Sequence, residues 1–191
     1  MIKRIINRIA LYLSRYVQPI MNYNVVHNGA IIKDTRISSS TVIEHPQKLV
    51  LNNNIFIGHY NYIEASNGME IGEGCQITNF VSITTHSSHD SIRIYGKQYR
   101  QFQIHNGYMR GAIKIGEYTF IGPHCVIMPG TNIGKGCIIQ AFSYVKGSFD
   151  DFSIIAGNPA KKIGDTRDRD KKLIEKFPEL EKFYNEWAEK K

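Results

Sequence analysis

Two histidines stand three residues apart in the stretch "ITTHSSHDSIRIYG", residues 83–96, directly after a pair of threonines. An imidazole titrates near neutral pH, so His86 or His89 could accept a proton from a hydroxyl as that oxygen attacks a carbonyl. Asp90 follows at once and could fix the tautomer of a neighbouring imidazole at the substrate site, or it could be an ordinary loop carboxylate. The alternative is that both histidines are polar residues of a surface loop. The spacing alone therefore predicts a candidate general base without choosing between the two.

The elements that must position these residues follow a period of six. Neither an α-helix nor a two-residue strand alternation has this period. A β-branched residue often followed by Gly predicts a short strand and then a corner, and three such sides close a triangular coil of eighteen residues. Stacked coils bury a continuous aliphatic core, so we predict a solenoid over residues 30–163. The repeat is strict at Ile115, Ile121, Ile127, Ile133, Ile139 and Val145, recurs at Ile71, Ile77 and Ile83 and at Leu51, Ile57 and Ile63, and is weaker at Ile31, Ile37, Ile43 and Leu49.

The repeat fails between Ile83 and Ile115, which predicts a long insertion loop over residues 87–112. Long loops in compact folds are often functional lids, and this one is rich in aromatic and basic residues. We expect it to bind the substrate through residues such as Arg93, Tyr95 and Tyr99, with His105 lining the lid.

Both ends of the chain predict helices. Residues 1–22 carry apolar residues at helical spacing among Lys3, Arg4, Arg8 and Arg15, which fits either a cap on the solenoid or contact with an anionic membrane face. These cations interrupt the apolar run, so we expect no secretory or membrane-spanning segment and a cytoplasmic protein, free or at the inner face of the membrane. Residues 166–191 predict a helix that Pro178 interrupts and that packs on the solenoid.

The formal charge of +7 suits an anionic partner. Neither a phosphate-binding Gly-rich loop nor a basic aromatic stripe for nucleic acid is found in the sequence, and no metal site is expected. The odd set Cys75, Cys125 and Cys137 lies in apolar repeat positions, which predicts packing in a reducing compartment.

The repeat and the later stretch "AGNPAKKIG", residues 156–164, resemble the hexapeptide-repeat acyltransferases of the maltose, galactoside and serine acetyltransferase type. The resemblance implies a mainly β fold, a left-handed parallel β-helix with terminal α-helices and an insertion loop. It also implies transfer of an acetyl group from acetyl-CoA to a hydroxyl of a sugar or cell-surface polysaccharide precursor, in a homotrimer with its sites at subunit interfaces.

The resemblance also assigns residues. "TTH" at 84–86 matches one form of the family's base motif and "SHD" at 88–90 another, so His86 and His89 both stay candidates, with His86 preferred. Asn79 is expected to bind the acceptor hydroxyl or to serve as a corner residue. Phe142 stands where the family more often has a small residue and is expected to narrow or redirect the groove for the pantetheine arm of coenzyme A. The residues expected to border coenzyme A are Ala141, Ser143, Lys146, Asn158, Pro159, Lys161 and Lys162.

Two other functions compete with acetyl transfer. A γ-carbonic anhydrase shares the solenoid fold but needs three histidines on zinc, and "IGHYNYIEA" holds only one of them. A non-enzymatic scaffold or membrane-surface adaptor would explain the basic helix but not the ending that resembles a coenzyme site.

Overall fold

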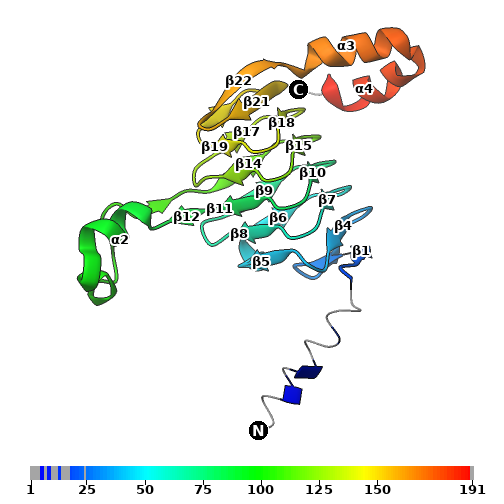
Figure 1. The fold of residues 1–191 in the computed structure, drawn as a ribbon. Coiled ribbons are helices and arrows are strands. Elements are labelled where there is room, and N and C mark those ends of the chain that lie inside the picture. The colour runs from blue at the N-terminus through cyan, green and yellow to red at the C-terminus, as the bar shows by residue number, and fades with distance from the viewer. Residues whose placement is uncertain (1–4, 7, 10–12, 14–17, 24, 190–191) are drawn as a thin grey trace.

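The computed structural model describes residues 5–6, 8–9, 13, 18–23 and 25–189, and the amphipathic helix predicted for residues 1–22 lies largely outside them. Three sheets form the sides of a triangular prism (Figure 1), and their strands pair in parallel except for β1 and β22 at the two ends of sheet 1. Sheet 1 contains β1 (Met21–Tyr23), β4 (Arg36–Ser38), β7 (Phe56–Ile57), β10 (Gln76–Ile77), β15 (Phe120–Ile121), β18 (Ile138–Ile139), β21 (Ser153–Gly157) and β22 (Ala160–Asp165). Sheet 2 contains β5 (Val42–Glu44), β8 (Tyr62–Glu64), β11 (Ser82–Thr84), β16 (Val126–Ile127) and β19 (Tyr144–Val145). Sheet 3 contains β6 (Leu49–Leu51), β9 (Met69–Ile71), β14 (Ile113–Ile115), β17 (Asn132–Ile133) and β20 (Ser148–Phe149).

The residues at the six-residue spacing form the core of the prism. Ile57, Ile77, Ile121 and Ile139 lie in register on successive strands of sheet 1, and each is 0% exposed. Backbone N–H groups bind carbonyls of the next coil, so each coil satisfies its polar groups through its neighbours. The predicted aliphatic core is confirmed, and Cys75, Cys125 and Cys137 are buried in it as expected.

The coils differ in length from the expected eighteen residues. Ile121 pairs with Ile139 eighteen residues on, but Ile37 pairs with Ile57 and Ile57 with Ile77, both twenty residues on. The two extra residues lie between sheet 2 and sheet 3, where Ile63 is followed by Ile71 after eight residues. We call this edge of the prism the site corner. In the next coil the insertion leaves the prism at the same corner.

The first coil also begins later than predicted. Ile31 is 65% exposed and lies on an antiparallel hairpin of β2 (Val26–His27) and β3 (Ala30–Ile31), so it is not a core residue. The parallel stacking starts at β4. At the other end β22 turns back antiparallel to β21 and closes sheet 1.

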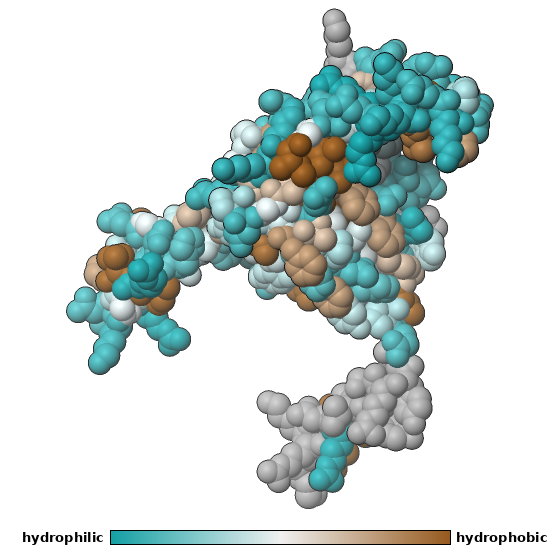
Figure 2. All heavy atoms as spheres, turned by 45° about the horizontal axis from the view of Figure 1, so that its top comes forward, coloured by the Kyte–Doolittle hydropathy of each residue, from teal (hydrophilic) through white to brown (hydrophobic). Residues whose placement is uncertain are grey.

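The insertion forms an arm that projects from the prism (Figures 1 and 2). Its base is the antiparallel pair β12 (His86–Ser87) and β13 (Met109–Arg110), and its tip contains α2 (His89–Tyr95) and η2 (Gly96–Gln101). Stacked rings hold the tip together, with Tyr99 and His105 centred 3.8 Å apart. The arm is therefore folded by its own aromatic residues.

The C-terminal segment packs on the prism as predicted. Pro178 separates α3 (Thr166–Lys176) from η3 (Pro178–Leu180) and α4 (Glu181–Ala188). The Trp187 ring lies 4.6 Å from that of Tyr118, so α4 covers a corner of the prism. No helix among the described residues is long and apolar enough to cross a bilayer.

The packing of the core predicts that replacing two isoleucines will have very different effects on the free energy of unfolding. Ile121→Ala removes a 0%-exposed side chain from the stack and should lower the free energy of unfolding by about 2–5 kcal/mol. Ile163→Ala, at a side chain 59% exposed on β22, should lower it by less than about 0.5 kcal/mol. Urea unfolding of both variants measures this, and equal losses would contradict the stacked core.

Candidate active site

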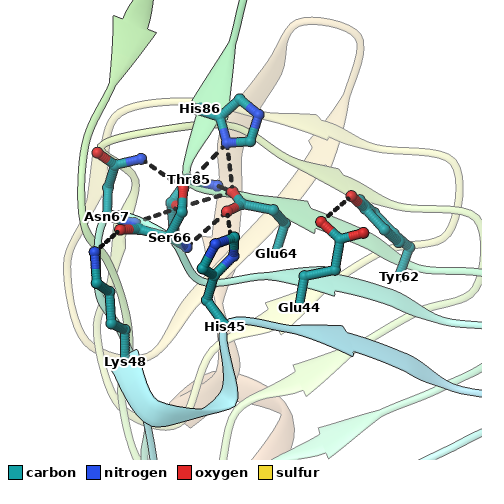
Figure 3. A network of polar contacts seen from close by, with 9 residues as sticks. All are labelled: Glu44, His45, Lys48, Tyr62, Glu64, Ser66, Asn67, Thr85 and His86. Atoms are coloured by element: carbon teal, nitrogen blue, oxygen red, sulfur yellow. Dashed lines mark hydrogen bonds and ion pairs between the residues drawn. The ribbon is translucent and has the colours of Figure 1, made fainter.

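A buried carboxylate at the site corner organises the candidate site (Figure 3). Glu64, at the end of β8, is 0% exposed. One oxygen accepts a hydrogen bond from the backbone N–H of Ser66 (2.6 Å), and the other accepts from the backbone N–H and the hydroxyl of Thr85 (3.0 and 2.8 Å). Burial alone would raise the pKa of Glu64, but the hydrogen bonds from Ser66 and Thr85 outweigh it and lower the pKa to about 2. The carboxylate is therefore ionised at neutral pH.

His86 lies against this charge. Its Nδ1 is 2.8 Å from Oε2 of Glu64 and 3.2 Å from the hydroxyl oxygen of Ser66. A lone pair on Nδ1 would face the carboxylate, so the proton is held on Nδ1 and the lone pair on Nε2. The His86 side chain is 34% exposed, so an acceptor molecule can reach it. This is the arrangement that a general base requires.

The base of the arm supports the other side of His86. Pairing of β12 with β13 sets His86 opposite Arg110 and brings Tyr108 to the imidazole. The rings of His86 and Tyr108 are stacked, 5.6 Å apart and 14° from parallel, and the Arg110 guanidinium lies 4.8 Å from the Tyr108 ring centre. Burial raises the pKa of Tyr108, so its phenol stays protonated at neutral pH.

His89 has different surroundings. It is the first residue of α2, and its side chain is 48% exposed. Its ring nitrogens lie 2.8 Å from the Ser87 hydroxyl and 3.5 Å from an oxygen of Asp90. Asp90, which we considered as an orienting carboxylate, accompanies His89 and is itself 52% exposed. Glu64 is the carboxylate beside His86, and the sequence analysis did not identify it.

The other predicted acceptor-binding residues are not gathered around His86. Asn79 precedes β11 whereas His86 follows it, and the Asn79 side-chain oxygen accepts a hydrogen bond from the backbone N–H of His59 (2.7 Å), which is the corner role. Tyr95 and Tyr99 are half-buried in the aromatic cluster of the arm, and Arg93 is exposed on α2.

The residues expected to border coenzyme A fall into two groups. Lys146 follows β19 and so lies at the site corner, where its Nζ is 3.8 Å from Sδ of Met109 in the arm. Ala141 and Ser143 precede β19, at the opposite edge of sheet 2. Ser143 is 2% exposed, donates to the Gln140 carbonyl (2.6 Å) and accepts from Gly157 N–H (3.3 Å), so its hydroxyl serves the fold. Asn158 and Pro159 form the β21–β22 turn, and Lys161 and Lys162 are exposed on β22.

Other parts of the described chain offer fewer side chains suited to an active site. A cavity of about 1010 Å³ lies against sheet 3 and α3, but its lining contains no His, Cys, Ser or Thr side chain. Among the described residues, no group of three His, Cys, Asp or Glu side chains is arranged to hold a metal ion.

A sequence signal for Glu64 exists in retrospect. Glu64 pairs in register with Thr84, twenty residues later, which is the coil length in this half of the prism. An acidic residue one coil before the "TTH" stretch therefore lies directly beneath it. Counting in coils of eighteen residues misses this pairing.

Comparison with known proteins supports the resemblance found in the sequence. Residues 112–147 match the family described as bacterial transferase hexapeptide (six repeats). The chain is 28% identical to a galactoside O-acetyltransferase of Escherichia coli, over 88% of this chain and 82% of the relative. It is 31% identical to a putative lipopolysaccharide biosynthesis O-acetyl transferase of the same organism, over 60% of this chain and 59% of the relative. It is 27% identical to a probable acetyltransferase of Mycobacterium tuberculosis, over 65% of this chain. The chain spans only 39% of that relative's length.

Solved structures show the same fold. An N-acyltransferase from Bacillus cereus, in complex with dTDP and 3-hydroxybutyryl-CoA, superposes with a TM-score of 0.59 at 20% identity, over 79% of this chain and 90% of the other. A maltose O-acetyltransferase from Clostridium difficile gives 0.58 at 22% identity, over 75% and 70%. The hexapeptide-repeat resemblance predicted from the sequence is thus confirmed.

The ionised state of Glu64 predicts a pH-dependent stability. The pKa of Glu64 is lowered from 4.5 to about 2, so its charge stabilises the fold above about pH 4.5, and this contribution is lost as the pH falls towards 2. Glu64→Gln should therefore cost about 2–3 kcal/mol more at pH 7 than at pH 2, by urea unfolding at both pH values.

The matched control is Glu70→Gln, whose carboxylate is 46% exposed beside Lys114. This variant should change stability by less than about 0.5 kcal/mol at either pH. A Glu64→Gln penalty that is the same at both pH values would contradict the assignment of an ionised, stabilising carboxylate.

Proposed function

We propose that this hexapeptide-repeat protein transfers an acetyl group from acetyl-CoA to a hydroxyl of a sugar, with His86 as the general base. The observation that carries the proposal is the Nδ1 of His86 beside the buried, ionised Glu64, which leaves Nε2 free to accept a proton. The curated relatives are named acetyltransferases, two of them O-acetyltransferases, and one neighbour of the same fold is a complex with an acyl-CoA.

The mechanism follows from this arrangement. Nε2 of His86 takes the proton of the acceptor hydroxyl while the hydroxyl oxygen forms a bond to the thioester carbonyl carbon. Glu64 stabilises the imidazolium that results. The tetrahedral intermediate then collapses, the carbon–sulfur bond breaks, and the proton on Nε2 passes to the leaving thiolate. The products are the acetyl ester and coenzyme A, and no acyl-enzyme is formed.

We further propose that the complete site lies between two chains of a homotrimer. His86 follows β11, whereas Ala141 precedes β19, so the two lie at opposite edges of sheet 2. The β21–β22 turn lies on the same side as Ala141, because Gly157 N–H bonds the Ser143 hydroxyl. In this proposal a second chain lies beside the first, so that its Ala141 and its β21–β22 turn face His86 of the first chain. The left-handed sense of the β-helix is also part of this proposal, because only the family resemblance supports it.

The acceptor is proposed from chemistry and resemblance together. A saccharide offers hydroxyls and flat apolar faces, and the arm presents aromatic and basic residues near His86. A precursor of a cell-surface polysaccharide is the acceptor that we expect, acetylated in the cytoplasm or at the inner face of the membrane. A non-enzymatic scaffold is the second candidate, and it predicts no binding of coenzyme A.

Two histidine variants test the base. His86→Ala should lower kcat at least about a hundredfold because the hydroxyl loses its proton acceptor, whereas His89→Ala should stay within about threefold of wild type. Turnover is measured with acetyl-CoA and one sugar acceptor, and calorimetry should show unchanged binding of coenzyme A to both variants. Near-wild-type turnover of His86→Ala would refute the assignment.

Two lysine pairs test the coenzyme site. Lys161 and Lys162 are exposed on β22 beside the turn, so replacing both with Ala should weaken binding of coenzyme A by about tenfold at low salt, and less at high salt. The control replaces Lys171 and Lys172, which are exposed on α3, and should change little. Calorimetry measures both. Equal affinity of the two double variants for coenzyme A would remove these lysines from the site.

A further inference from the structure

A second imidazole faces the carboxylate that orients His86. His45 Nδ1 lies 3.6 Å from Oε1 of Glu64, while His86 Nδ1 lies 2.8 Å from Oε2 (Figure 3). We infer that His45 is a further positioning residue of the proposed reaction, in which a proton on His45 keeps His86 unprotonated and therefore available as the base. This inference rests on the proposed function, and no comparison assigns a role to His45.

The fold places His45 there by the extra length of the early coils. His45 lies at the site corner one coil before Glu64, between β5 and η1 (Pro46–Lys48). Its backbone is left-handed, with φ of 56°, a conformation that His tolerates better than most residues. Its side chain is 47% exposed, so protons exchange freely with solvent.

One carboxylate serves two imidazoles at this corner. A first proton taken up by the pair is stabilised by Glu64 wherever it sits, but a second proton would add a second positive charge beside the same single negative charge. The imidazole that is protonated first therefore opposes protonation of the other. Hydration favours a proton on His45, the more exposed of the two, whereas the shorter distance to Glu64 favours one on His86. The inference assigns the first proton to His45, and Nε2 of His86 then keeps its lone pair.

The other charged groups near this corner do not take over the role of Glu64. Glu44, the residue before His45, accepts a hydrogen bond from the Tyr62 hydroxyl (2.9 Å). Lys48 donates to the Ser66 carbonyl (2.7 Å), and Arg110 lies over Tyr108 on the other face of the site. The two cations add positive charge near the imidazoles, so they too disfavour double protonation. Among the described residues, Glu64 is the carboxylate that contacts both imidazoles.

The pH dependence of turnover tests the inference. In His45→Asn the first proton can bind only to His86, so the acid limb of kcat/KM should move to higher pH by about half to one unit relative to wild type. Asn is chosen because it accepts left-handed backbone. The control is His27→Asn, at an imidazole whose Nε2 bonds the Leu49 carbonyl instead, and it should leave the acid limb in place.

Ring-proton NMR titration of the wild-type protein supplies a readout that needs neither activity nor a variant. Signals of His45 and His86 should each titrate in two steps, because each senses the proton on the other. Two independent single-step curves, or an acid limb that does not move in folded His45→Asn, would overturn the inference. A wild-type protein without acetyl transfer would instead remove the proposed function, and the titration would still decide whether the two imidazoles share Glu64.

Discussion

The whole structure depends on one packing constraint. Every side of every coil must place a β-branched or similar side chain on the axis of the prism, and every backbone group must find its partner in the coil above or below. Ile57, Ile77, Ile121 and Ile139 show the result, a column of fully buried residues in register. A residue added within a side would break both the column and the hydrogen bonds, so added residues must lie at corners.

The site corner uses this freedom three times in succession. The first two coils carry two extra residues at this edge, and the third opens into the arm. At this corner the backbone N–H groups of Ser66 and Thr85 donate to Glu64, which is what makes a buried charge tolerable. Burying a carboxylate without such donors would cost several kcal/mol. The corner therefore supplies a fixed negative charge, and the coil stacked on it supplies the imidazole that the charge orients.

The period of six was sufficient to predict the prism, its aliphatic core, the buried cysteines and the place where the arm leaves, because each of these depends only on which residues face the axis. Pro178 likewise predicted the break between α3 and α4, since proline cannot continue a helix. Glu64 was missed because its role depends on the register between coils, which two extra corner residues change. Ser143 was expected to border coenzyme A, and Asn79 to bind the acceptor or to serve as a corner residue; in the structure both side chains bind neighbouring backbone N–H groups. The six-residue pattern does not predict such side-chain hydrogen bonds within the fold.

The position of the candidate residues along sheet 2 gives the remaining argument. Parallel strands of one sheet begin at one edge and end at the other, so residues before β19 and residues after β11 cannot meet within one prism. The candidate base lies at the ends of these strands, and Ala141 together with the β21–β22 turn lies at their beginnings. Lys146 is the exception, because it follows β19 and reaches the arm. In the proposed trimer a thioester that touches both sets would span two chains, with the arm and Lys146 of one prism facing the turn of the next. The cavity of the single chain lies against sheet 3 and α3, away from His86, so the proposed association of chains would supply the concave surface that this chemistry needs.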